Sequence, residues 1–293
     1  MEGLIDSLTI SENQKLFLRE KAYSLYNGLK MISQNLIPYW SSLYLSKDTY
    51  QYTLKRFWFE TSFDMGLFIK NRFDVDIYFI FGKNNTNPLE QNHLIGSILF
   101  ELLYSHLKVY QFNYREYMKI LKEPPYIHAI PIRMDYQGIS ILFNCIPAIE
   151  LPNEYLIIPN GLGDTKKIIP KLEVQTHSKI NRKQNGRMTK LILLIKYWNF
   201  NWGKPIKGHL IEHLVEFIFN KIEIHSWDRA VKTFFSRAIY FLDKKRLLHH
   251  GIYNQLSILE VYSSDELKKF LQVLREAEMY AQKGKWEELF SDL

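Results

Sequence analysis

Residues 74–82, with the sequence DVDIYFIFG, carry two aspartates one residue apart inside an apolar and aromatic run. The run predicts a β-strand, in which residues two apart point to the same face, roughly 7 Å apart. Asp74 and Asp76 therefore project together, and two such carboxylates repel each other unless a cation lies between them. Hard oxygen ligands suit Mg²⁺ or Mn²⁺, so the pair predicts a metal site, with an edge strand bearing two solvated acids as the alternative. The residues expected to face the core are Val75, Ile77, Phe79 and Phe81.

The first half of the chain mixes predicted helices and strands around one sheet. Residues 11–34 predict a long amphipathic helix, and Ser11 with Gln14 resembles a capping box at its start. Two further strands are expected on either side of a turn at Gln137 and Gly138. The other predicted elements are a short strand at 54–60 and a helix at 93–110.

After about Pro170 the pattern is helical throughout. The stretch PNGLGDTKKIIPK, residues 159–171, predicts the connector between the two halves. We therefore expect an α+β protein with two lobes, a small mixed β-sheet lobe at 1–165 and a C-terminal helical lobe at 166–293. The helices expected in the second lobe cover 188–200, 206–222, 226–242 and 263–284.

Composition narrows the classes of protein that fit. The formal net charge of +7 favours anionic partners such as nucleotides, nucleic acid or a membrane surface, although a surplus of surface lysine explains it equally well. The single cysteine, Cys145, excludes a disulfide framework and a cysteine-rich zinc site. The start MEGLIDSLTISENQ lacks the pattern of a signal peptide, and no apolar run is long enough to span a membrane. We expect a cytoplasmic protein without membrane attachment.

The region before the two aspartates resembles a known signature. Ser62, Gly66 and then Asp74-x-Asp76 match the polymerase-β-type nucleotidyltransferases, whose signature is G-S-x-x-x-G-T followed by D-x-D. The resemblance implies that Ser62 binds the nucleotide's terminal phosphates and that Asp74 and Asp76 bind the catalytic metals. A turn at a helix N-terminus would add N–H donors for the phosphates, whereas an ordinary N-cap is the alternative role of Ser62. Two positions depart from the signature, Thr61 and Leu67.

A third carboxylate is expected from a later strand in that family, in a pattern like D-x-h-P-A, where h is apolar. The chain has FNCIPAIE, in which Pro147 and Ala148 fit but Asn144 takes the place of the acid. An amide is a weaker metal ligand and cannot accept a proton, so the site would bind nucleotide and react slowly. A natural pseudoenzyme, an atypical active enzyme and an engineered Asp→Asn substitution remain open. Asp135, on the neighbouring strand, is a substitute candidate, with a hairpin-turn acid as the alternative.

The second half is similar to the helical lobe of the cGAS/oligoadenylate-synthetase-like branch, the CD-NTases, whose pattern is K-x-W-N, a loop, and S-Y-x-L-E. Lys196, in KYWN, stands at the family's triphosphate-contacting lysine, and Lys190 is a less certain helper. Glu212 matches the L-E glutamate, whereas Gly208 replaces the serine. A lysine flanking a tryptophan core is the alternative role of Lys196.

The resemblance covers roughly residues 10–290, because the C-terminal region also fits it. Other candidate residues do not depend on the resemblance. Tyr253 and Asn254 resemble the turn before the family's last helix. The basic cluster at 179–187 is expected to be a solvated loop, with triphosphate or RNA binding as the alternative. His177 is a candidate for stacking on a base, and so are Tyr155 and Tyr197. His249-His250 lacks the partners of a metal site.

The resemblance implies a two-metal-ion nucleotidyltransferase that uses Mg²⁺ or Mn²⁺ and nucleoside triphosphates. The nucleotide would bind in a cleft between the lobes. The implied product is a cyclic or short oligonucleotide second messenger of antiviral defence, with RNA or a protein activator as a further partner. A terminal nucleotidyltransferase acting on tRNA or RNA and a catalytically dead nucleotide- or RNA-binding pseudoenzyme are the alternatives. Base choice, linkage, product size and oligomeric state stay open at this point.

Overall fold

The computed structural model describes residues 1–35, 52–59, 61–67, 69, 74–83, 95–113, 118–121, 129–136, 139–151, 155–159, 165–243 and 263–291. The chain divides into two compact units built from several segments each. The sheet unit comprises Ser11–Asp64 and Arg72–Lys171, and the helical unit comprises Met1–Ile10, Met65–Asn71 and Leu172–Leu293. The predicted lobes were 1–165 and 166–293. They differ from these units chiefly because Met1–Ile10 and Met65–Asn71 belong to the helical unit.

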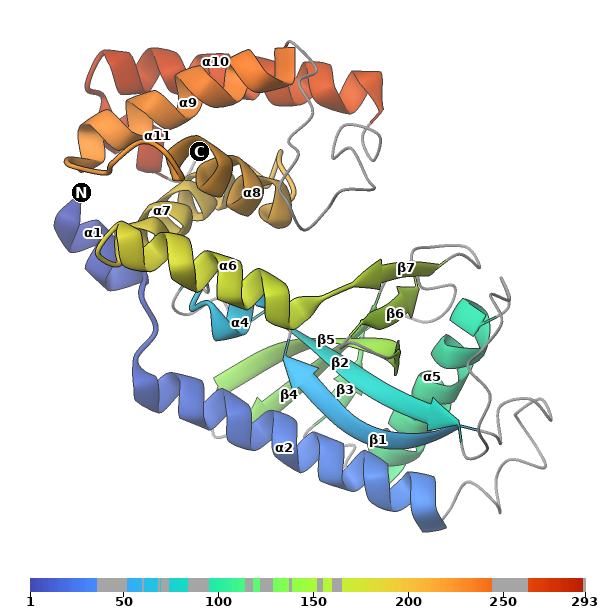
Figure 1. Cartoon of the computed structure of the whole chain (residues 1–293). Helices are drawn as coiled ribbons and strands as arrows, with labels where there is room; N and C mark the ends of the chain where they lie inside the picture. Colours follow the sequence, from blue (N-terminus) through green and yellow to red (C-terminus); the bar gives the residue numbers. More distant parts are fainter. Residues whose placement is uncertain are drawn as a thin grey trace. The chain divides into compact units, whose positions relative to one another are not determined.

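Within the described residues, seven strands of the sheet unit form one mixed sheet (Figure 1). Its order is β1-β2-β5-β4-β3, with β6 pairing with β5 and β7 with β6. β2 and β5 run parallel, whereas the other pairs are antiparallel. The predicted α+β class is confirmed. The strands are β1 (Tyr52–Phe59), β2 (Asp74–Lys83), β3 (Met118–Ile120), β4 (Ile130–Tyr136), β5 (Ile139–Glu150), β6 (Leu156–Pro159) and β7 (Thr165–Ile168).

One face of the sheet packs against α2 (Glu12–Asn35) and α5 (Ile95–Asn113), which also contact each other. The Phe81 ring of β2 meets the His106 ring of α5 edge-on, with the ring centroids 5.8 Å apart. The prediction for β2 is therefore confirmed, because all four of its core-facing positions are buried. They are Val75, Ile77, Phe79 and Phe81.

The opposite face of β2 is apolar along most of its length. Tyr78 and Ile80 are buried in a second cluster with residues of β5, β6 and β7. Asp76, two residues before Tyr78, is therefore a polar residue near the start of a face that is apolar farther along the strand. The alternative of an edge strand is wrong, since β2 lies between β1 and β5.

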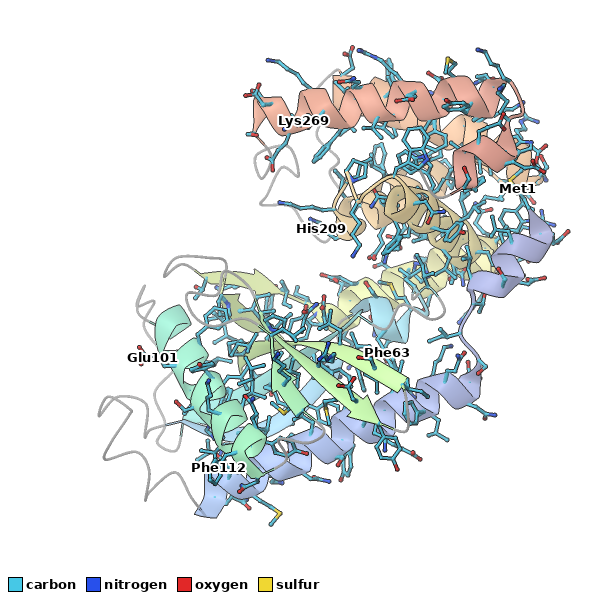
Figure 2. All side chains as sticks on the ribbon, turned by 180° about the vertical axis from the view of Figure 1, so that it is seen from behind. Met1, Phe63, Glu101, Phe112, His209 and Lys269 are labelled. Carbon is cyan, nitrogen blue, oxygen red and sulfur yellow. The ribbon has the colours of Figure 1, made fainter. Side chains whose placement is uncertain are left out.

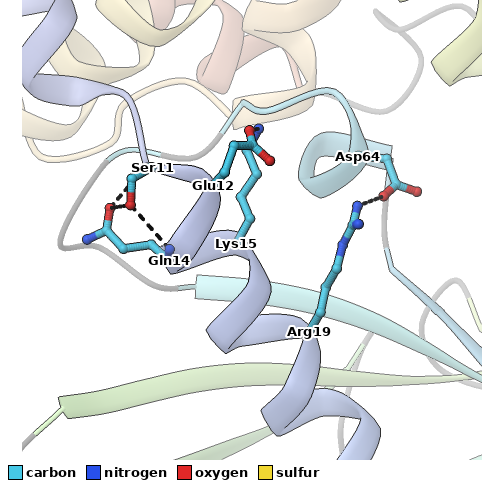
Figure 3. Close-up of polar contacts among 6 residues, drawn as sticks. All are labelled: Ser11, Glu12, Gln14, Lys15, Arg19 and Asp64. Atoms are coloured by element: carbon cyan, nitrogen blue, oxygen red, sulfur yellow. Dashed lines mark hydrogen bonds and ion pairs between the residues drawn. The ribbon is translucent and has the colours of Figure 1, made fainter.

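The helix α2 begins where the sequence predicts. The backbone N–H of Gln14 donates to Ser11 Oγ at 3.2 Å, and the backbone N–H of Ser11 donates to Gln14 Oε1 at 2.9 Å (Figure 3). Both bonds satisfy backbone donors that the first turn of a helix leaves unpaired, so the predicted capping box is confirmed.

Gly28 allows α2 to approach α5 closely. A Cβ atom at position 28 would lie 2.1 Å from Cε2 of Tyr110, which is far inside contact distance. We expect Gly28→Ala to lower the free energy of unfolding by about 1–3 kcal/mol, as overpacking does in other cores. Gly3→Ala is the matched control in α1, because its Cβ meets nothing within 4 Å. Urea unfolding of both variants measures the difference, and equal values would contradict the close approach.

His106 gives the sheet unit a predicted pH dependence. Burial lowers the pKa of its ring to about 4, although its Nδ1 donates to the Leu102 carbonyl at 2.7 Å. The unfolded chain binds a proton near pH 6.5, so the folded state loses stability as the pH falls from about 6.5 to 4 and keeps it above that window. The loss at pH 4 is expected to reach about 3 kcal/mol. Urea unfolding at several pH values measures this effect. Between pH 6.5 and 4, the free energy of unfolding should fall less steeply with pH for His106→Gln than for the wild type. An equal pH dependence of the two proteins would show that His106 is not its cause.

The helical unit surrounds the fully buried Trp198 with apolar side chains from most of its helices. Four of the helices confirm the elements predicted for the second half, α7 to α10. The helices that lie wholly or mostly in this unit are α1 (Glu2–Leu8), α6 (Pro170–Lys183), α7 (Arg187–Asn201), α8 (Gly208–Phe219), α9 (Trp227–Asp243), α10 (Ser264–Gln282) and α11 (Trp286–Phe290).

Two predicted loops are not loops. The predicted connector contains β7, and α6 begins at its end. The basic cluster at 179–187 lies on the last turns of α6 and on the turn to α7, where Arg187 donates to the carbonyls of Ile224 and His225. Among the described residues, no helix has the length and apolar character needed to cross a membrane.

Candidate functional site

The strands β2 and β5 bring Asp76 and Asn144 together in the sheet unit. Their Cα atoms are register partners, and those of Asp74 and Leu142 are paired two residues earlier. Asn144 Nδ2 donates to Asp76 Oδ1 at 2.6 Å. The sequence led us to expect Asp76 and position 144 in one sheet, and the structure makes them neighbours on adjacent strands. The side chain of Asp74 lies outside the described part of the structure.

The Asp76 carboxylate is half-buried, and its charge affects its neighbour on β5. The pKa of Cys145 is raised, first by complete burial of the thiol and then by the negative charge of Asp76. Among the described side chains, no three of His, Cys, Asp or Glu gather as a metal site. The contact between Asp76 and Asn144 thus brings one carboxylate and one amide together as potential metal ligands.

Asp135 does not substitute for a third carboxylate. It lies four residues along β4 from Pro131, the register partner of Asn144, which is about 14 Å along a strand. Its Oδ2 pairs with Nε of Arg133 at 3.3 Å, and both side chains are exposed. Asp135 is therefore a surface acid near the hairpin turn, which is the alternative role that we considered for it.

Ser62 lies on α4 (Thr61–Asp64), a single helical turn that directly follows β1. An isolated turn of this length is not stable, so its neighbours fix its position. Phe63 (Figure 2) is buried. Its ring stacks on that of Phe59 of β1, with the ring centroids 4.2 Å apart. Gly66 of the signature has a φ of 73°, a backbone conformation that glycine adopts without strain.

Arg19 of α2 is a second support for the serine turn, and no motif predicted it. Its guanidinium donates to Asp64 Oδ1 at 3.3 Å (Figure 3) and lies 5.5 Å from the centroid of the Phe63 ring. Burial raises the pKa of Asp64, and the charge and hydrogen bond of Arg19 oppose that rise. Contacts that join residues 45 positions apart have no local sequence pattern.

The helical unit gathers three signature positions around Lys196 of α7: Glu212, Leu67 and Gly208. Its ammonium forms an ion pair with Glu212 of α8 and donates to the Leu67 carbonyl at 3.2 Å. A Cβ atom at Gly208 would lie 3.7 Å from Lys196 Cε, so the first residue of α8 borders the lysine stem. The Leu67 side chain is buried in the core of this unit. The role of the Leu67 carbonyl was not predictable, since any residue type offers one.

Lys190 lies on α7 one and a half turns before Lys196 and has a different partner. Its Nζ bonds to Asp6 Oδ1 of α1 at 3.0 Å, and both side chains are well exposed. The two predicted phosphate lysines therefore have different ion-pair partners: Lys190 pairs with Asp6 of α1, and Lys196 pairs with Glu212 of α8.

The prediction that His177 stacks on a base is wrong. The ring is buried among helices, where Nδ1 bonds to Glu216 Oε1 at 2.6 Å and Nε2 to Thr189 Oγ1 at 2.9 Å. These bonds tie α6 to α8 and to α7, so His177 belongs to the packing of the helical unit. Tyr253, Asn254, His249 and His250 lie outside the described residues.

Comparison with known proteins gives one sequence relative and a consistent fold. No family model matches the chain. A probable cyclic nucleotide synthase of Bacillus cereus (strain VD146) is 32% identical over 125 residues, which cover 41% of this chain and 38% of that protein. The match thus spans well under half of the relative's length.

Solved structures match over nearly the whole chain. CdnC of E. coli MS115-1, solved with ATP, has 14% identity and a TM-score of 0.66, covering 97% of this chain and 94% of its own. CdnC in a complex with HORMA-deltaN has 16% identity and a TM-score of 0.65, covering 97% and 93%. The GTP-bound form of Vibrio cholerae DncV has 12% identity and a TM-score of 0.68, covering 95% and 86%. The polymerase-β-type fold and the resemblance to the CD-NTases, both predicted from the motifs, are confirmed.

Proposed function

We propose that this chain is a CD-NTase that binds nucleoside triphosphates and joins them into a cyclic or short oligonucleotide. The observation that carries the proposal is the pairing of Asp76 with position 144 on adjacent parallel strands. A carboxylate at the start of an otherwise apolar sheet face needs a partner, and here that partner stands at the family's third metal-ligand position. The motif residues also follow one another in the order that the CD-NTase resemblance implies, which is Ser62, Asp76, Asn144 and Lys196.

The residues at this place fit a hard divalent cation. Asp76 offers a carboxylate, and the Asn144 amide can present Oδ1 instead of Nδ2 after half a turn of its χ2 bond. Asp74, two residues before Asp76 on β2, would complete the set. A bound Mg²⁺ or Mn²⁺ would neutralise charge on the phosphates.

The remaining residues would bind and orient the nucleotide. Ser62 would donate its hydroxyl to a terminal phosphate oxygen, and Lys196 would offer its ammonium to the same end of the nucleotide. Lys190 would be a weaker helper, because Asp6 already neutralises it. The reaction would form a bond between a ribose oxygen and the α-phosphorus and break the bond to pyrophosphate, with the hydroxyl proton passing to solvent, and Asp76 would be the residue that holds the cation for this step.

Substrates and partners are proposed by analogy with the matched structures. One CdnC structure contains ATP, and DncV was solved with GTP, so ATP and GTP are the first substrates to test. The CdnC complex with HORMA-deltaN makes a protein activator the first kind of partner to test. A cytoplasmic location and a role in antiviral defence belong to the same proposal.

The pseudoenzyme alternative is favoured by one observation. Asn144 donates a hydrogen bond to Asp76, whereas a third carboxylate in its place would accept a proton or bind a cation. With an amide there, the site would still hold a nucleotide through Asp76 and Lys196. Such a protein would act by binding nucleotide rather than by turnover.

Incubation of the purified chain with four labelled nucleoside triphosphates and Mn²⁺ tests the proposal. Phosphatase-resistant products that form without RNA support nucleotide cyclisation or oligomer synthesis. Products that require added tRNA support the terminal transferase. Tight triphosphate binding without product supports the pseudoenzyme, whereas no binding of any triphosphate rejects all three functions.

A further inference from the structure

The helix α8 carries two buried glutamates one turn apart, each paired with a different helix. Glu212 forms an ion pair with Lys196 of α7, and Glu216 bonds to His177 of α6. Both glutamate side chains are 9% exposed. A buried carboxylate is costly unless it is paired with a positive charge or a hydrogen-bond donor. Each of these glutamates has such a partner on another helix.

The Lys196 side chain is largely buried, and its ammonium has two contacts. It forms an ion pair with Glu212 and donates to the Leu67 carbonyl, and the side chain is 15% exposed. A Cβ atom at Gly208 would lie 3.7 Å from Lys196 Cε, so the lysine stem passes the first residue of α8. Of the two contacts, Glu212 is the one whose charge is opposite to that of the ammonium.

We propose that Glu212 is a positioning residue that orders Lys196 for the phosphate end of a nucleotide. A free lysine loses much rotamer freedom when it binds phosphate, and a side chain that is already ordered loses less. The carboxylate also keeps the charged ammonium stable at a largely buried place until phosphate arrives. Glu216 makes no contribution to this ordering, since its partner is His177. This inference rests on the proposed function for its ligand, though the Glu212–Lys196 link itself does not.

A double-mutant cycle with inorganic triphosphate as the probe tests the proposal on the full chain. Glu212→Gln keeps the shape and an acceptor oxygen but removes the charge, and we expect triphosphate binding to weaken by about tenfold. In a Lys196→Met background the same change should have less than about a twofold effect, because Glu212 acts only through the lysine. Glu216→Gln is the matched control and should leave the affinity unchanged in both backgrounds.

Three results would overturn the proposal. They are an equal effect of Glu212→Gln with and without Lys196, an equal effect of Glu216→Gln, and tighter or unchanged binding in Glu212→Gln. Each would assign Glu212 either to the packing of α8 or to repulsion of the phosphates.

A second measurement separates this proposal from the proposed function. Amine acylation followed by mass spectrometry reports the reactivity of Lys196 without any nucleotide. We expect severalfold faster labelling of Lys196 in Glu212→Gln and unchanged labelling in Glu216→Gln, because only the first breaks its ion pair. If the wild type fails to bind triphosphate while this labelling difference appears, the proposed function fails and the positioning link stands. Unchanged labelling in Glu212→Gln overturns the link itself.

Discussion

Replacing Asn144 with aspartate is expected to make the stability of the protein depend on a divalent cation. In the wild type, Asn144 Nδ2 donates to Asp76 Oδ1 at 2.6 Å. An aspartate at 144 would replace this donor with a second carboxylate, and two like charges at this separation repel. We expect Asn144→Asp to lower the free energy of unfolding by about 1–3 kcal/mol in EDTA. Mn²⁺ at about 100 times its dissociation constant should return about 2.7 kcal/mol.

Urea unfolding with and without Mn²⁺ measures this linkage. Asn199→Asp is the matched control, because Asn199 is also hydrogen-bonded and is shielded from water at least as well as the half-buried Asn144, with both of its bonds to the backbone of Ile206. It should destabilise the helical unit without a response to Mn²⁺. If both variants respond alike, the cation does not bind between positions 76 and 144.

The same variant carries an expectation for turnover. A restored carboxylate would complete the family's ligand set, and changes at groups that support a metal site alter activity by about 10- to 100-fold. Product formation from labelled nucleotides should therefore rise by at least this factor over the wild type. Equal turnover of the two proteins would show that the wild-type amide is no impairment, and the atypical active enzyme would then be the correct reading of Asn144.

Elements with strong periodic or capping patterns could be predicted from the sequence. The alternation in DVDIYFIFG fixed both β2 and its buried face, and Ser11 with Gln14 fixed the start of α2. The sequence also led us to expect Asp76 and Asn144 on strands of one sheet, whereas the parallel pairing that makes them register partners comes from the structure. These features are local, or they join elements that each have a clear pattern.

Short and weakly apolar elements could not be predicted. β7 has four residues, too few to show alternation, and α6 has a mostly polar sequence whose buried positions include His177. The contact of Lys196 with the Leu67 carbonyl joins a side chain to a backbone atom, for which no residue type is specific. The same holds for the orientation of the Asn144 amide, since it depends on its partners in the folded chain.

Removing the charge of Lys196 is expected to weaken nucleotide binding strongly. Hydrogen bonds to charged groups contribute about 1.5–3 kcal/mol, so Lys196→Met should raise the dissociation constant for ATP with Mn²⁺ by about 10- to 100-fold. Methionine keeps most of the apolar stem, so the variant tests the charge rather than the packing. Isothermal titration calorimetry measures the change.

The control for this variant separates binding from stability. Lys196→Met leaves Glu212 without its ion-pair partner, so some loss of folding stability is expected as well. Lys232, a half-buried lysine of α9 that lies 5.7 Å from the centroid of the Trp286 ring, offers the same substitution elsewhere in the helical unit. Lys232→Met should change stability and leave ATP affinity unaltered, whereas equal affinities of the two variants would contradict a phosphate-binding role for Lys196. Lys190→Met should fall between them, because Asp6 already neutralises Lys190 and phosphate must compete with that pair.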